Sequence, residues 1–132
     1  MIQTGIYSLI TGFSSVSALI GTRLHPVTLK EAETLPAMTY QLVGGSSDPT
    51  LTTSGLQRLR VQFDCWGANY DDAAGLRKAL IKELNGYRGL LSDGTYLQNA
   101  DLIGSIGVDY FEDVPRQYRC MVEFYFYFVF PS

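Results

Sequence analysis

A single histidine and a few acids are the residues of this chain with the greatest potential for catalysis. His25 stands before Pro26, and no further histidine or cysteine accompanies it at a spacing typical of metal ligands. A catalytic nucleophile needs a turn to hold it, and the chain has no Gly-x-Ser-x-Gly elbow. Because a base also needs a group to orient it, we expect His25 to be structural.

The acids have structural explanations. Asp71 and Asp72 follow Asn69 and fall in the first turn of a predicted helix, where the helix dipole favours negative charge. Glu112 and Asp113 precede Pro115 in a predicted turn, where Asp is common. The glycines also lack the spacing of a phosphate-binding loop. The sequence therefore predicts no enzyme, no cofactor and no metal site.

The two cysteines, Cys65 and Cys120, are too few for a disulfide framework. Each falls on the apolar side of a predicted strand, which favours two reduced, buried thiols in a cytoplasmic setting. A bridge between them stays open if their strands are neighbours.

Composition indicates one domain that contacts other proteins. The 132 residues include nine Tyr and seven Phe but only 17% charged residues. A surface poor in charge and rich in aromatic rings is typical of protein interfaces. The net charge of -3 and the scattered basic residues argue against nucleic-acid binding. No run of about 20 apolar residues is present to cross a membrane.

The elements that must position these residues begin with residues 59–67, where apolar and polar side chains alternate. That period predicts a strand with one buried face. Asn69 then predicts the N-cap of a helix that runs to about Asn85, with Gly86 after its end. We expect Arg77, with Lys78, Lys82 and Glu83, to face solvent.

The remaining segments complete an α/β domain of the α+β type, spanning residues 1–132. We expect a mainly antiparallel sheet of four or more strands, packed against an N-terminal helix pair and one longer central helix. The expected helix pair covers 2–13 and 15–20, and the expected strands cover 23–26, 38–43, 96–103 with 106–111, and 117–130. Residues 44–55 predict a long flexible loop, and Gly104 predicts a bulge or bend.

The second face of the last strand is the candidate interface. Arg119 and Glu123 are placed to pair across strands with Asp64 and Arg60. The aromatic and apolar residues beside them would form an exposed patch unless helices cover both faces. The candidate subunit-interface residues are Arg58, Arg60, Asp64, Met121, Glu123, Tyr125 and Tyr127.

The order of these segments resembles that of the tailed-phage tail terminator proteins, also called tail completion or tail-to-head joining proteins. Four pieces carry the resemblance, which covers nearly the full length: Gly21-Thr22-Arg23-Leu24-His25-Pro26, Leu35-Pro36 before Gln41-Leu42-Val43-Gly44, Arg60-Val61-Gln62-Phe63-Asp64-Cys65-Trp66-Gly67, and Tyr118-Arg119-Cys120-Met121-Val122-Glu123-Phe124. Each is a hydrophobic pattern and not a chemical fingerprint.

The resemblance implies a structural virion protein, assembled in the host cytoplasm and located in the tail or neck. It would form a homo-oligomeric ring, expected to be a hexamer, that caps the completed tail tube and ends its polymerisation. Its partners would be the tail tube protein and the head connector or head-closure protein. Within this hypothesis the tube or connector contact falls on the long loop, at Ser46, Ser47, Asp48, Pro49, Thr50, Leu51, Thr52 and Thr53.

Two alternatives stay open. One is a small oligomeric ligand-binding or regulatory α/β domain, which would need a pocket with convergent polar groups. The other is a related head-closure component of the neck, which differs only in where the ring sits.

Overall fold

The computed structural model describes the chain except residues 1, 30–32, 47–55, 114–115 and 130–132. Within that part, three helices and six strands follow the chain in the order α1 (Ile2–Thr11), α2 (Ser14–Ile20), β1 (Leu24–Pro26), β2 (Ala37–Ser46), β3 (Leu56–Gly67), α4 (Tyr70–Leu84), β4 (Gly89–Leu90), β5 (Tyr96–Asp113) and β6 (Arg116–Val129).

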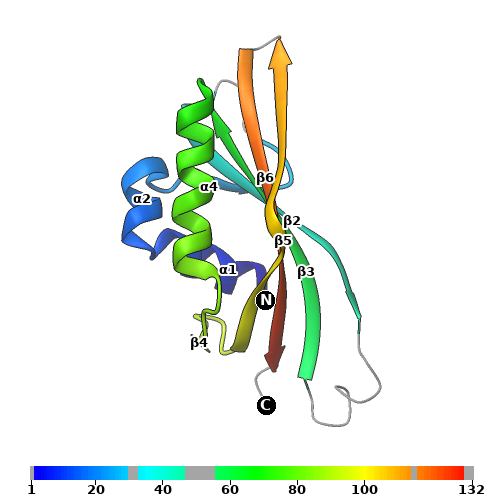
Figure 1. Ribbon diagram of the computed structural model, residues 1–132. Helices are drawn as coiled ribbons and strands as arrows, with labels where there is room; N and C mark the ends of the chain where they lie inside the picture. Colours follow the sequence, from blue (N-terminus) through cyan, green and yellow to red (C-terminus); the bar gives the residue numbers. More distant parts are fainter. Residues whose placement is uncertain (1, 30–32, 47–55, 114–115, 130–132) are drawn as a thin grey trace.

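The strands form one sheet in the order β1-β2-β3-β6-β5-β4. Only β1 and β2 are parallel, and the other neighbours are antiparallel. The helices lie together on one face of this sheet, with α4 running along β3 and β6 (Figure 1). The opposite face, called here the outer face, has no described helix over it.

The core lies between the helices and the inner face of the sheet. In β3 and β6 every second side chain points inward, and Phe63, Phe124 and Phe126 are fully buried there. The rings of Phe63 and Phe124 meet edge to face, with their centroids 6.0 Å apart. Burying an aromatic side chain removes a large apolar area from water, so these rings contribute strongly to the free energy of folding. Ile6, Ile10, Leu76 and Leu80 of the helices cover them.

The corner between β3 and α4 is close-packed. A Cβ atom on Gly67 would lie 2.7 Å from the backbone nitrogen of Ala73, so only glycine fits without displacing the helix. The side chain of Asn69 accepts a hydrogen bond from the Asp72 backbone N–H and caps the helix. This corner fixes α4 over the inner face.

The fold class, the helix pair, the central helix and the strands agree with the sequence predictions. The predicted bend in β5 is also present: Gly104 has φ +74°, and the register with β6 shifts between Ile103 and Val108. Two predictions were wrong at their edges. Residues 44–46 continue β2 and do not begin a loop, and Glu112 and Asp113 continue β5 and do not form a turn. Backbone pairing with β3 and β6 extends both strands past the point where apolar alternation ends.

Candidate interaction surface

The predicted interface residues lie together on the outer face. Arg58, Arg60 and Asp64 come from β3, and Met121, Glu123, Tyr125 and Tyr127 come from the neighbouring β6. The two strands pair in register, with Arg58 opposite Tyr127, Arg60 opposite Tyr125 and Asp64 opposite Met121. Because alternate residues of both strands point the same way, the seven side chains share one surface.

The predicted ion pair between Arg60 and Glu123 is present. Arg60 Nε donates to Glu123 Oε2 at 2.6 Å, and its terminal nitrogen donates to Oε1 at 2.9 Å. This two-bond geometry fixes both side chains. The hydrogen bond from Arg60 to Glu123, with the attraction between their charges, raises the pKa of Arg60 above its usual value.

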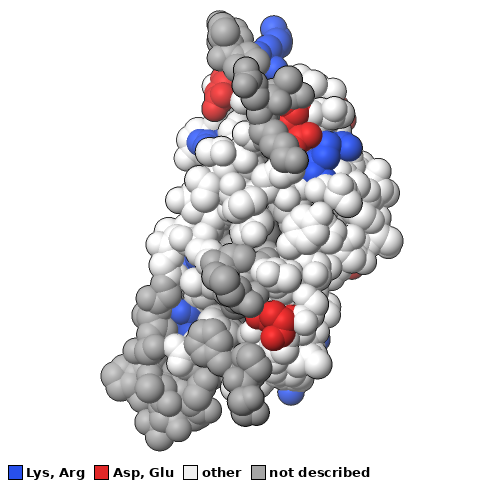
Figure 2. Space-filling model, turned by 180° about the vertical axis from the view of Figure 1, so that it is seen from behind, with Lys and Arg blue, Asp and Glu red and all other residues white. Residues whose placement is uncertain are grey.

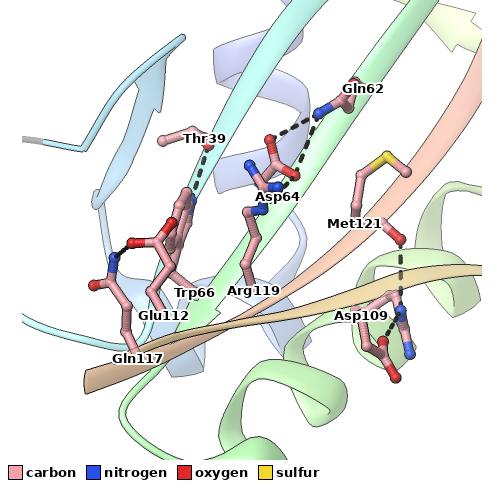
Figure 3. A network of polar contacts seen from close by, with 10 residues as sticks. Thr39, Gln62, Asp64, Trp66, Asp109, Glu112, Gln117, Arg119 and Met121 are labelled. Atoms are coloured by element: carbon pink, nitrogen blue, oxygen red, sulfur yellow. Dashed lines mark hydrogen bonds and ion pairs between the residues drawn. The ribbon is translucent and has the colours of Figure 1, made fainter. Parts of the chain in front are cut away.

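Asp64 is the buried acid of this face, with 6% of its surface exposed. The side-chain amide of Gln62 donates to both of its oxygens, at 3.3 and 3.0 Å (Figure 3). The predicted pairing with Arg119 is present as an ion pair, with Arg119 Nε 3.9 Å from Oδ1, a distance too long for a hydrogen bond. Burial raises the pKa of Asp64, and the Gln62 hydrogen bond and the Arg119 charge offset this effect only in part.

Arg119 lies between two aromatic rings. Its guanidinium carbon is 4.1 Å from the centroid of the Tyr110 ring and 5.5 Å from that of Trp66. Both distances fall within the range of cation–π attraction. Trp66 is held in turn by Thr39, whose hydroxyl oxygen accepts a 3.0 Å hydrogen bond from the indole N–H. The Nε atom of Arg119 is buried and has no hydrogen-bond partner among the described residues.

Aromatic side chains continue the outer face along β6. The rings of Tyr125 and Tyr127 have centroids 6.3 Å apart, and the Arg58 guanidinium lies 4.8 Å from the Tyr125 centroid. These side chains and Met121 are half-buried within a single subunit. The outer face therefore combines partly exposed rings with charges that already have partners. Such a mixture is typical of protein interfaces.

Arg77 was predicted to face solvent, and this was wrong. Its side chain is 7% exposed because it reaches over the inner face of the sheet to Asp109 of β5, where Nη1 donates to Oδ1 at 2.6 Å. Tyr70 donates to the other oxygen of Asp109 at 3.0 Å. Burial raises the pKa of Asp109, but the hydrogen bonds from Arg77 and Tyr70 outweigh it, so the pKa lies below its usual value.

The far ends of β5 and β6 carry aromatic side chains that sequence reasoning did not single out. They extend beyond the N-terminal end of α4 (Figure 1). Phe111 packs on Tyr118 with centroids 4.8 Å apart, and Tyr118 meets Tyr70 at 6.1 Å. Val108, Tyr110 and Phe111 each remain between 43% and 49% exposed. The alternation in residues 106–111 was the signal available, but it does not tell which face lacks a cover.

Charged side chains are sparse over much of the molecule. Seen from behind, a broad central area shows no charged side chain, and the charges gather toward the two ends (Figure 2). A surface with few charges has a low desolvation cost on association. This distribution agrees with the composition.

The candidate tube-contact residues are placed only at their first position. Ser46 ends β2, and residues 47–53 lie outside the described residues. The assignment of this segment to a partner contact stays a prediction.

Comparison with known proteins identifies the fold. The sequence matches no protein-family profile and no curated protein. Among solved structures, the fold is similar to that of a chain from the virion of a native gene transfer agent particle, with a TM-score of 0.69 over 96% of this chain and 93% of that chain. The two sequences are 16% identical, so the likeness is one of fold.

The remaining candidate residues have structural surroundings. His25 contacts Glu33 through Nε2. Cys65 and Cys120 are buried free thiols, as the sequence predicts, and they lie directly opposite each other on the neighbouring strands β3 and β6. Burial raises the pKa of Cys65 well above its usual value and that of Cys120 to about 11. Within the described residues, no cluster of His, Cys, Asp or Glu is arranged to hold a metal ion. No described helix is long and apolar enough to cross a membrane.

A hollow of 430 Å³ lies between α1 and the segment around β4, lined by Gly5, Ser8, Leu9, Gly12, Phe13, Tyr87, Leu90, Leu91 and Ser92. None of these side chains is charged. A small-molecule site normally adds a few convergent polar groups to an apolar lining, and here only the two serines and Tyr87 offer them.

Proposed function

We propose that this protein is a structural component of a phage-like virion, and that it acts as a tail terminator. In this role it forms a homo-oligomeric ring, a hexamer, on the end of the completed tail tube. The ring stops addition of tail tube protein and presents a surface to the head connector or head-closure protein.

The observation that carries this proposal is the outer face of the β3–β6 pair. It is a broad surface with no described helix over it, and it presents Tyr125, Tyr127 and Met121 beside the Arg60–Glu123 pair. A ring subunit must contact two neighbours, the tube and the connector, and it needs this kind of surface. The fold shared with a chain of a gene transfer agent virion supports the same role.

The hollow beside α1 does not favour the ligand-binding alternative, because the described residues that line it carry no charge and few polar groups. A head-closure role would use the same ring and the same surface. Only the position of the ring in the particle separates the two.

The proposal is tested by mixing purified protein with assembled tail tubes. Light scattering of the protein alone gives its oligomeric state, and electron microscopy of the mixture shows whether rings sit on tube ends. We expect capped tubes that no longer lengthen when tail tube protein is added. Tubes that keep growing and carry no ring at their ends would contradict the proposal.

Two variants place the contacts. Changing Tyr125 and Tyr127 to Ser should weaken ring formation while the monomer stays folded, because both side chains are half-buried in the single subunit. Deleting residues 47–53, which follow β2, should leave the ring intact and abolish capping, since the proposal assigns those residues to the tube or connector. A deletion variant that still caps tubes would remove that assignment and leave the ring proposal standing.

A further inference from the structure

The sheet of this protein has an open edge along half of β5. β4 pairs with β5 only at Tyr96 and Leu97. The segment after α4 covers the next residues, because the Gly86 N–H donates to the carbonyl of Ala100 and the Asn85 side chain accepts from the Leu102 N–H. Beyond Leu102, over residues 103–113, no described strand pairs with the side of β5 that faces away from β6.

The register identifies which backbone groups point out from this edge. The Met38 backbone N–H donates to the carbonyl of Arg23, the residue just before β1, so the backbone polar groups of Met38 point away from its β3 partner, Cys65. Bonding sides alternate from strand to strand in an antiparallel ladder. The backbone groups of Cys65 therefore point toward Cys120 on β6, and those of Cys120 point back toward β3. The backbone N–H and C=O of Asp109, opposite Cys120, consequently point away from β6, out of the open edge. The backbone N–H and C=O of Phe111, two residues further along β5, point out of the same edge.

Exposed apolar side chains accompany this open backbone. Val108, Tyr110 and Phe111 lie on its length, two on the outer face and one on the inner face. Natural sheet edges are usually blunted by charges, by bulges or by a covering segment. Here the acids and the bulge are present, but three large apolar side chains remain exposed beside them. An edge of this kind is suited to a specific strand partner.

The opposite side of the sheet has a second open edge. β1 covers β2 only at residues 38–40, and the Val27 N–H donates to the Tyr40 carbonyl at the end of that contact. From Gln41 to Ser46, no described strand lies on the outer side of β2. Val43, at the register shift in this stretch, is 45% exposed.

Charge decides which edges match. All charged residues of β5 are acids: Asp101, Asp109, Glu112 and Asp113. Pairing two β5 edges would therefore place acids against acids, which is destabilising. β2 has no charged residue, and the strand beside its open half carries Arg58 and Arg60, opposite Ser46 and Gly44. Pairing with the uncharged β2 edge of a second copy avoids this repulsion, so the two edges are compatible.

We propose that residues 108–113 of β5, beyond the bulge, pair strand to strand with residues 41–46 of β2 in the next copy of this chain. The contact is head to tail, since the two edges lie on opposite sides of one sheet. Repetition of the contact carries the sheet from subunit to subunit, and rotation at each contact closes a ring. This inference rests on the proposed ring and names the strands that hold it together.

The test compares two substitutions at one residue. Phe111→Ala removes the phenyl side chain but keeps the backbone N–H that points out of the edge. Phe111→Pro removes both the side chain and this N–H. The bonds that neighbouring residues make to β6 remain, because edge strands tolerate proline where the N–H faces out. Light scattering over a dilution series gives the concentration of half-assembly. We expect Phe111→Pro to raise it about tenfold or more above Phe111→Ala, the effect of losing an interface hydrogen bond at every contact.

A second pair of variants tests the partner edge. Val43→Asp places an acid on the open half of β2, and Val43→Asn is the neutral control of the same shape. We expect Val43→Asp, but not Val43→Asn, to weaken assembly at low salt. Assembly of Val43→Asp should recover at higher salt, because salt screens the repulsion between the new acid and the β5 acids. Equal assembly by the two variants at low salt would argue against this pairing.

Backbone amide exchange of the unmodified protein removes any dependence on variant folding. We expect the amides of Asp109 and Phe111 to be protected in the assembled form and to exchange faster after dilution to monomers. A ring in which both amides exchange at the monomer rate would overturn this inference and leave the proposed function intact. Edge-paired oligomers that do not bind tube ends would overturn the proposed function and leave this inference intact. A protein that stays monomeric even on tube ends would overturn both.

Discussion

The two faces of the β3–β6 pair are built from alternate residues of the same two strands, yet they differ in every physical respect. The inner face places Phe63, Phe124 and Phe126 against the helices with no exposed surface. The outer face carries Arg60, Glu123 and Tyr125 between them, half-buried and bonded within the subunit. The inner residues supply the free energy of folding, and the outer residues leave a surface that is ordered before any partner binds.

The sharpest test of this comparison is a pair of alanine substitutions at adjacent residues. Phe124→Ala opens a cavity in the inner face and should lower the free energy of unfolding by about 3–5 kcal/mol. Tyr125→Ala removes a half-buried ring and should cost about 1 kcal/mol or less. Urea unfolding of both variants measures the difference. Similar losses would mean that the outer face contributes to the stability of the single subunit as the core does.

The next effect concerns Asp109, whose side chain points to the inner face near the N-terminal end of α4. Asp109→Asn removes the charge that faces Arg77, a side chain only 7% exposed. Because Asp109 itself is nearly half exposed, we expect a loss of about 1 kcal/mol in the free energy of unfolding. Glu112→Gln, on the same strand and bonded only to Gln117 in the described contacts, is the control and should cost less.

The sign of the pH dependence adds a second measurement at Asp109. Its pKa in the folded protein is lowered, so its stabilisation is present above the unfolded pKa and is lost as the pH falls through the folded value. The midpoint temperature of thermal unfolding should therefore fall more steeply with decreasing pH in the unmodified protein than in Asp109→Asn. Parallel pH curves would contradict the pairing with Arg77.

Asp64 should show the opposite sign on the outer face. Its pKa is raised by burial, so the folded protein holds this proton more tightly, and stability falls as the pH rises from the unfolded pKa to the folded one. Asp64→Asn should remove this part of the pH dependence. At pH values above the folded pKa of Asp64, the free energy of unfolding of the variant should equal that of the unmodified protein or exceed it by less than about 1 kcal/mol. Unfolding curves between acidic and neutral pH measure this. A variant that is less stable throughout would show that Arg119 stabilises the charge more than burial opposes it.

The smallest effect should come from Arg60 and Glu123. Their geometry is favourable, but Arg60 lies at the surface, where water and salt weaken the attraction. A double-mutant cycle with Arg60→Ala and Glu123→Ala should give a coupling energy that disappears in high salt. Coupling that persists in high salt would place the pair in a less solvated environment than the subunit shows.

Much of the fold follows from alternation and caps that are visible in the sequence. The strand before Gly67, the Asn69 cap and the bend at Gly104 depend on local conformational preferences, and each was predicted. Arg77 stands four residues after Ala73 and three before Leu80, on the buried stripe of α4, and it was misplaced because its charge was taken to require solvent. Its long side chain instead reaches an acid 32 residues away.

The open edge of β5 was beyond sequence reasoning for a related reason. Whether a strand has a neighbour depends on which segments are adjacent in the sheet, and two-residue β4 carries no pattern of its own. The outer face was predicted residue by residue, since alternation assigns faces. Its lack of a helical cover came only from the arrangement of α1, α2 and α4.

The register shift in β5 also has a consequence for how the length of this gene product can vary. Between the pairs Ile103–Glu123 and Val108–Met121, β5 has three more residues than β6. Insertions or deletions there change only the size of the bulge, because the pairs on either side hold their own register. A one-residue deletion in β6 would instead turn Phe124 outward and Tyr125 inward. Length variation among natural variants of this chain should therefore concentrate at residues 104–107 and be absent from β6.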